Sequence, residues 1–392
     1  MKLNQDVIDR VNRAVRPDRL MELAVDLIRI PSPTQHAAAV ADRLAEVLAA
    51  EGFEVGRPEA AWPRSPAVVT RYESGVPGRT LQFNGHLDTV HLPFVPPRIE
   101  DGILYGSGAS DMKAGVAAMC EALLAVRDSH VLEAGGILLT AHDLHEAPWG
   151  RGQQLAALID EGYVGDAALL PEYLSNILPV VGRGMANVEV TLSREGTPVH
   201  EVLGGLGQPR VIAAGADLVT RLEALDRSLT GRTHPLAGRE SVFVGKVAGG
   251  EIYNQSPTEF HLAGTCRWLP GTAVEKVRHR FLEAVDGTET PPGIQVDARF
   301  HYRRDAFELD LEDPLVGAFE DSCQAVMGRT LPHGAKPFID DGNTFGELAG
   351  IETITHGPRA TGAHTTGEQV PVDDLIRVAK VYACAAVAFC AG

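Results

Sequence analysis

Hydrophobic and polar positions repeat along this chain with two different periods. Through the first part and again near the end, apolar residues recur every three to four positions, which predicts helices, and short apolar runs between them predict buried strands. The expected helices cover residues 18–29, 37–50, 111–127, 153–160, 314–327 and 343–349, and a final helix opens at 373. The expected strands cover residues 67–72, 80–84, 136–141, 167–170 and 351–355. This alternation of helices and strands favours an α/β fold.

The middle of the chain follows a different order. Its expected elements are, in sequence, residues 186–192 (strand), 209–226 (helix), 241–247 and 258–268 (strands), 273–285 (helix) and 294–302 (strand). The order βαββαβ is typical of a ferredoxin-like unit. Because the α/β pattern resumes afterwards, we expect one domain made of residues 1–183 and 303–392, with an insert at 184–302.

Composition restricts the function further. The chain has 392 residues and 44% hydrophobic content, enough for two domains with separate cores. A net charge of −17 argues against nucleic acid or an anionic membrane as partner. The five cysteines are odd in number and contain no Cys-x-x-Cys, so we expect reduced thiols in a cytoplasmic protein. No signal peptide is expected at residues 1–18, and the longest apolar run, 381–391, is too short to span a bilayer.

Ionisable side chains gather where the expected strands end. His86, Glu146 and Glu172 each follow an apolar strand, and Asp111 stands where a glycine-rich loop enters a helix. Taken singly, His86 is more typical of a hydrogen-bonded turn, and Asp111 of a helix N-cap, than of a metal site. Ligands of open α/β sheets, however, collect outside the carboxyl ends of the strands. The convergence therefore favours a metal site, in which Asp88, two residues after His86, would orient the histidine.

Three segments carry a resemblance to a known family. Residues 85–90 (Gly-His-Leu-Asp-Thr-Val), 105–115 and 362–368 resemble the metal-binding motifs of the M20 metallopeptidase family. That family includes acetylornithine deacetylase, succinyl-diaminopimelate desuccinylase and glutamate carboxypeptidase. The resemblance covers almost the whole chain, with looser matches at residues 198–200 and 254–257.

The resemblance implies a fold, a cofactor and a ligand set. The fold is a mixed-sheet catalytic domain with an inserted ferredoxin-like domain that serves as lid and dimerisation surface. The cofactor is a pair of divalent metal ions. Zinc is the expected metal, and cobalt and manganese are alternatives. One metal would be bound by His86, Asp111 and Glu172, and the other by Asp111, Glu146 and His364, with Asp111 bridging.

The same resemblance implies substrate contacts on the insert. Arg267 and Asn254 would hold the α-carboxylate of the substrate. His200 would donate to the developing oxyanion of a neighbouring subunit's reaction, which implies a homodimer. Cys266 stands where an acid is common in the family, which leaves the identity of the substrate open.

His145 departs from the family pattern. The family has two adjacent acids at this point, of which the first is the catalytic base, and here that pair reads His145-Glu146. A neutral imidazole can accept a proton near pH 7. His145 is therefore a substitute base, a further metal contact, or a sign of lost hydrolysis, and His142 and Asp143 are rivals for the role.

These observations favour a metal-dependent hydrolase that cleaves the amide bond of an N-acyl amino acid, of the deacetylase or desuccinylase type, through a metal-bridging water. The catalytic residues would be Asp88 and His145. A carboxypeptidase or dipeptidase of the same fold, acting on short peptides, is the alternative. A non-hydrolytic metal-binding homologue is a third possibility, because of His145.

Overall fold

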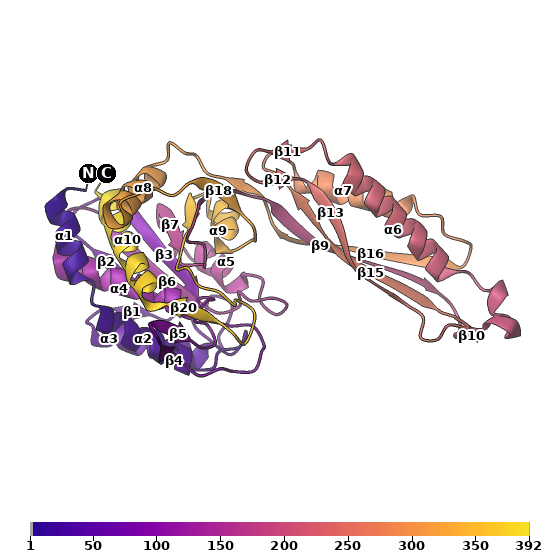
Figure 1. Ribbon diagram of the computed structural model, residues 1–392, viewed down its shortest axis with the longest axis horizontal. Coiled ribbons are helices and arrows are strands. Elements are labelled where there is room, and N and C mark those ends of the chain that lie inside the picture. The colour runs from indigo at the N-terminus through magenta and orange to yellow at the C-terminus, as the bar shows by residue number, and fades with distance from the viewer. Residues whose placement is uncertain (1–2, 392) are drawn as a thin grey trace. The chain divides into compact units, whose positions relative to one another are not determined.

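The chain is divided between two units, each built around its own sheet (Figure 1). The computed structural model describes residues 3–391. The first unit runs to Val180 and adds Leu309–Gly334 and the chain from Asp340 onward. The second unit comprises Val181–Glu308 with Ala335–Ile339, and the predicted insert, 184–302, lies inside it.

A six-stranded mixed sheet forms the centre of the first unit. Its order is β1 (Val55–Gly56), β2 (Val68–Glu73), β6 (Gly136–His142), β3 (Thr80–His86), β7 (Ala167–Leu170) and β19 (Thr353–Thr355). The last four strands run parallel, whereas β1 and β2 pair antiparallel at one edge. Because β3 and β6 are parallel neighbours with His86 opposite His142, their carboxyl ends open at the same edge of the sheet.

Helices cover both faces of this sheet. They are α1 (Gln5–Ala14), α2 (Pro17–Arg29), α3 (Ala38–Ala50), α4 (Lys113–Ser129), α5 (Gln153–Asp160), α8 (Pro314–Met327), α9 (Asp341–Thr344) and α10 (Val372–Cys390). On one face Phe83 of β3 packs against Tyr382 of α10, with ring centroids 5.3 Å apart. On the other face Leu158 of α5 packs against Val69 and Leu138.

Several short elements complete the first unit and the connections. The strands β4 (Arg98–Glu100), β5 (Ile103–Tyr105) and β20 (Gln369–Pro371) form a small antiparallel sheet. Further short strands are β8 (Leu178–Gly182), β17 (Phe307–Glu308) and β18 (His333–Lys336). The segment expected as a helix at 343–349 is α9 followed by one π-helical turn, Phe345–Ala349.

The second unit is a ferredoxin-like domain with the element order βαββαβ. Its elements are β9 (Gly184–Arg194), α6 (Val211–Ser228), β13 (Ser241–Gly249), β15 (Glu259–Trp268), α7 (Val274–Asp286) and β16 (Ile294–Arg304). The sheet order is β13-β15-β9-β16, antiparallel throughout. Alternate residues of β9 are buried in a core that includes Val190, Leu218 and Phe281. The predicted mixed α/β fold with an inserted βαββαβ unit is therefore confirmed.

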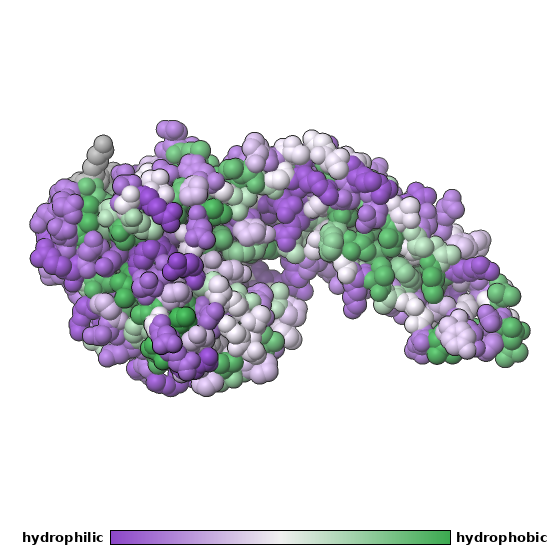
Figure 2. Space-filling model, viewed as in Figure 1, coloured by the Kyte–Doolittle hydropathy of each residue, from purple (hydrophilic) through white to green (hydrophobic). Residues whose placement is uncertain are grey.

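Hydrophobic side chains are exposed at one end of the second unit. There β10 (Val199–His200) pairs with β14 (Gln255–Ser256), and two short 3-10 turns follow at Glu201–Leu203 and Gly205–Gly207. Figure 2 shows hydrophobic residues gathered at this end, and Val202, Leu203 and Leu206 are 73%, 77% and 68% exposed. The unit also carries a small hairpin of β11 (Thr233–His234) and β12 (Gly238–Arg239).

All five cysteines are buried free thiols. Within residues 3–391, no helix combines the length and the apolar character that crossing a membrane requires.

Candidate metal centre

The expected site residues of the first unit meet at the carboxyl ends of its parallel strands. His86 is the last residue of β3, while Glu146 and Glu172 follow β6 and β7. Asp111 lies in the loop that enters α4, and all four side chains are buried. His364 comes from the loop after β19, and its side chain is 57% exposed. Parallel strand order thus brings together residues that are distant in the sequence.

Asp111 lies between two groups of possible metal ligands. Its Oδ1 is 3.1 Å from Nε2 of His86, and its Oδ2 is 3.3 Å from Nε2 of His364. His364 Nε2 is also 3.2 Å from Oε2 of Glu146, and His86 Nε2 is 3.9 Å from Oε1 of Glu172. The two oxygens of Asp111 therefore face different histidines, as a bridging ligand requires.

Among the ion pairs within residues 3–391, the buried carboxylates of this cluster face histidines. Burial and the nearby Asp111 raise the pKa of Glu172 well above its usual range. Hydrogen bonds to Asp111 and Glu146 raise the pKa of His364 to about 10. Burial and His145 act to lower the pKa of His86, but Asp111 and Asp88 outweigh them and raise it to about 9.

The donor set fits divalent metal ions. The potential ligand atoms of His86, Asp111 and Glu146 lie within 4.8 Å of one another, as do those of His86, His145 and Glu172. Imidazole nitrogens and carboxylate oxygens are ligands of zinc, cobalt and manganese. A dication would take the place of the histidine protons, because metal binding requires neutral imidazoles.

Asp88 acts mainly on the polypeptide backbone. Its carboxylate accepts hydrogen bonds from the N–H groups of His145, at 3.2 Å, and Glu146, at 2.9 Å. The ring nitrogen Nδ1 of His86 is 2.9 Å from the backbone carbonyl oxygen of Asp88 and 3.6 Å from its carboxylate. The expected contact with His86 is thus made more closely by the carbonyl group, while the carboxylate fixes the peptide that carries His145 and Glu146.

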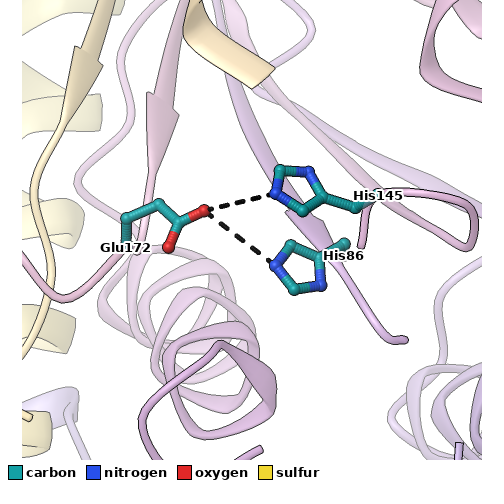
Figure 3. A group of neighbouring side chains, drawn as sticks. All are labelled: His86, His145 and Glu172. Carbon is teal, nitrogen blue, oxygen red and sulfur yellow. Dashed lines mark ion pairs between the residues drawn. The ribbon is translucent and has the colours of Figure 1, made fainter. Parts of the chain in front are cut away.

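His145 lies beside the proposed ligands. Its ring stacks on His86 with centroids 4.0 Å apart and planes 6° from parallel, and Nε2 is 3.9 Å from Oε1 of Glu172 (Figure 3). Nδ1 is 2.9 Å from Oδ1 of Asp341. Burial lowers the pKa of His145, but Asp341 and Glu172 outweigh burial and raise it well above its usual range.

The two rivals of His145 are engaged elsewhere. The carboxylate of Asp143 accepts the backbone N–H groups of Gln35, at 3.0 Å, and Ala37, at 3.2 Å. His142 Nε2 is 2.9 Å from Oδ2 of Asp341. Neither side chain therefore replaces His145 beside Glu172.

Sequence reasoning missed two carboxylates that support the site. Oε2 of Glu368 accepts the backbone N–H groups of Gly108, Ser110 and Asp111 at 3.0–3.1 Å, so it fixes the loop that carries Asp111. Asp341, at the start of α9, contacts His145 and His142. Glu368 belongs to the last motif, residues 362–368, so the sequence could have indicated a role for it. No motif includes Asp341, so the sequence did not indicate a role for that residue.

Glycines allow the backbone to pack closely behind Glu172. A Cβ atom on Gly115 of α4 would come within 2.5 Å of the carbonyl oxygen of Pro171. A Cβ atom on Gly357 would come within 2.1 Å of the carbonyl oxygen of Glu172. Any larger residue at either position would displace the strand end that carries Glu172.

The proposed substrate contacts His200, Asn254 and Arg267 lie in the second unit. His200 Nδ1 accepts the backbone N–H of Val202 at 3.3 Å, and its Nε2 is 3.0 Å from the side-chain amide of Asn254. Burial and the neighbouring Arg183 lower the pKa of Arg267. Within residues 3–391 no carboxylate forms an ion pair with Arg267.

Comparisons with known proteins agree over almost the whole chain. The model of peptidase family M20/M25/M40 matches residues 82–388. Succinyl-diaminopimelate desuccinylase of Methylorubrum extorquens is 28% identical over 391 residues, which span 92% of this chain and 96% of that protein.

Solved structures share the fold. Aminopeptidase PepT from Bacillus cereus superposes with a TM-score of 0.80 at 20% identity, over 96% of this chain and 99% of that one. A dinuclear metal binding peptidase of the M20 family from Bacillus subtilis superposes with a TM-score of 0.66 at 16% identity, over 95% and 97%.

The family match begins in β3, ends in α10 and encloses every proposed ligand from His86 to His364. The chain therefore belongs to peptidase family M20/M25/M40 and is a metallohydrolase that acts on amide bonds.

Proposed function

We propose that the enzyme hydrolyses the amide bond of N-acyl amino acids, as a deacetylase or desuccinylase does. The observation that carries the proposal is the group of histidines and carboxylates at the ends of the parallel strands. The possible ligand atoms of His86, Asp111 and Glu146 lie within 4.8 Å of one another, and so do those of His86, His145 and Glu172. The desuccinylase relative, similar over nearly its full length, supports an acyl amino acid as substrate.

Two divalent metal ions would be bound at this cluster, with zinc as the expected metal. His86 and Glu172 would bind one ion, Glu146 and His364 the other, and Asp111 both. When bound, such a pair polarises the amide carbonyl and lowers the pKa of a bridging water toward neutrality.

His145 would act as the proton acceptor. Its Nε2 would take the proton of the attacking water and return it to the leaving nitrogen of the amide. Support comes from its stacking on His86 and from its position facing Glu172 (Figure 3). Asp88 would keep His145 and Glu146 in place by holding their backbone N–H groups.

The second unit would bind the substrate. Arg267 would pair with the α-carboxylate, with Asn254 as a further donor. His200 would donate to the developing oxyanion of the reaction.

A carboxypeptidase or dipeptidase is the second candidate. The guanidinium of Arg267, which has no carboxylate partner in the described part of the chain, would bind the terminal carboxylate of a short peptide equally well. Substrates with a free α-amine separate the two candidates, because a dipeptidase hydrolyses them and a deacylase requires an acylated amine.

We also propose that the enzyme is a cytoplasmic homodimer. The buried free thiols support a reducing compartment. The exposed Val202, Leu203 and Leu206 directly follow His200, and a second copy would bury them. A monomer in light scattering at assay concentration would count against the dimer.

The test is release of primary amine from a panel of N-acetyl, N-succinyl and N-aroyl amino acids and dipeptides. Metal-stripped protein is assayed with and without added zinc, cobalt or manganese. Metal-dependent turnover of an N-acyl amino acid is expected.

The same panel is run with the Asp111→Asn variant to confirm that turnover arises at this site. Dipeptide turnover without N-acyl turnover would transfer the proposal to the second candidate. If no substrate reacts while metal is bound, the proposed activity is wrong.

A further inference from the structure

Asp341 is a buried carboxylate that joins three polar side chains next to the proposed metal site. Its Oδ2 faces Nε2 of His142 at 2.9 Å and Nδ2 of Asn84 at 3.2 Å. Its Oδ1 faces Nδ1 of His145 at 2.9 Å. Only 3% of Asp341 is exposed, so water does not compete for these contacts.

The amide of Asn84 has a fixed orientation. Its Oδ1 accepts from the hydroxyl of Thr140 at 2.8 Å, and that hydroxyl in turn accepts from Nε2 of Gln82 at 2.9 Å. The N–H side of the Asn84 amide is therefore directed at Asp341, which must present an acceptor there.

The contact with His145 decides which ring nitrogen carries the proton. An ionised carboxylate only accepts hydrogen bonds, so Nδ1 of His145 must donate. A neutral ring then has its lone pair on Nε2. That nitrogen faces Glu172 beside the ring of His86, within the group of possible metal ligands (Figure 3).

We propose that Asp341 is a positioning residue that acts through His145. It holds the ring in place and keeps the proton on Nδ1, so that Nε2 is the free acceptor at the metal site. This inference rests on the proposed role of His145, and it adds a carboxylate 196 residues further along the chain to the catalytic arrangement. A structural carboxylate would stabilise the fold without fixing the tautomer of His145.

The Asp341→Asn variant separates these roles. The oxygen of the new side-chain amide would take the place of Oδ2 and face Asn84 and His142, and its NH₂ group would face Nδ1 of His145. Nδ1 must then accept, which moves the ring proton to Nε2 and removes the free acceptor. In Ser-His-Asp enzymes the same exchange reverses the histidine tautomer and lowers kcat by about 10⁴-fold.

The primary measurement is the tautomer of His145 itself. Long-range proton–nitrogen NMR spectra are recorded on zinc-loaded protein labelled with nitrogen-15 histidine, and the His145→Gln variant assigns the signal. We expect the proton on Nδ1 in the wild type and on Nε2 in Asp341→Asn. No substrate is needed, so failure of the proposed amide hydrolysis leaves this test standing.

Kinetics and metal content provide the second readout. In Asp341→Asn we expect kcat to fall by about 100-fold or more, KM to change less than about threefold, and bound zinc to be unchanged. Asp340→Asn is the matched control. It removes the neighbouring charge while asparagine still caps α9, so the His145 tautomer should not change.

Three results would overturn the proposal. The first is a wild-type His145 with its proton on Nε2 or on both nitrogens. The second is an Asp341→Asn variant that keeps the wild-type tautomer. The third is a loss of activity matched by a loss of bound zinc. The first can be read from the wild type alone, even if the variant does not fold.

Discussion

Two clusters of buried charge lie in the first unit, and their carboxylates are compensated differently. Where α2 meets α4, Arg19 makes a two-pronged contact with Glu121, at 2.7 and 2.9 Å, and a third contact with Asp128, at 2.9 Å. At the strand ends, Asp111 and Glu172 lie near histidines and have no guanidinium or ammonium partner among the ion pairs within residues 3–391.

The difference separates a structural cluster from a functional one. The guanidinium of Arg19 and the backbone N–H of Arg16 satisfy the carboxylate of Glu121, so that cluster joins two helices. Within residues 3–391, the ion pairs of Asp111, Glu146 and Glu172 are made to histidines, whose protons a metal ion can displace. Buried acids that lack a fixed cation are therefore the better indicator of a metal site.

Removing a site carboxylate should have the largest effect. Asp111→Ala is expected to lower kcat/KM by about 10³-fold or more, because polarisation by the metals contributes several kcal/mol. Bound metal, measured by elemental analysis, should fall with it. An Asp111→Ala variant that keeps its bound metal and its activity would contradict the comparison.

Breaking the structural cluster should affect stability alone. Arg19→Met leaves Glu121 buried without its cation and should lower the free energy of unfolding by about 3 kcal/mol in urea titrations. Metal content and kcat should stay at wild-type values. The Arg29→Met variant, which alters a solvent-exposed arginine of the same helix, is the control.

Loosening the loop that carries Asp111 should have an intermediate effect. Glu368→Ala removes the acceptor of three backbone N–H groups and should weaken metal binding by about 10–100-fold, measured by competition with a chelating dye. Glu368→Gln, which keeps one acceptor oxygen, should weaken binding less. Glu161→Ala, on the surface, should leave it unchanged; equal affinities in all three variants would remove Glu368 from the site.

The smallest effect concerns pH. Burial and Arg377 lower the pKa of His356 to about 3, whereas an unfolded histidine titrates near 6.5. Its contribution to stability is therefore complete above about pH 6.5 and is lost progressively as the pH falls toward 3. The urea midpoint of metal-free protein should drop between pH 7 and 5.

His356→Gln tests this assignment because glutamine does not titrate, so the drop should shrink in the variant. The site histidines behave in the opposite way. With pKa values of about 9 and 10, His86 and His364 lose their contribution only as the pH rises above about 6.5. An unchanged acid response in His356→Gln would assign the drop to another group.

Local patterns were sufficient to predict most of the fold. The period of buried residues predicted the helix at 314–327, and α8 spans Pro314–Met327. Glycine and proline at the ends of elements predicted strand limits, as at β7. The helix α1 was missed, because its few apolar residues, Val7, Ile8 and Val11, stand among charges and are buried only by packing on α4 and α10.

For the site, the sequence by itself determined which strand ends carry ionisable residues, and the motifs predicted their grouping. Only the tertiary structure decided that Glu368 holds the loop of Asp111 and that Asp341 meets His145. The physical reason is that these carboxylates are paired across long stretches of chain by packing, and no local spacing encodes such a pairing. A sequence specifies the groups that titrate and bind, whereas the packed fold decides which donors and acceptors they meet.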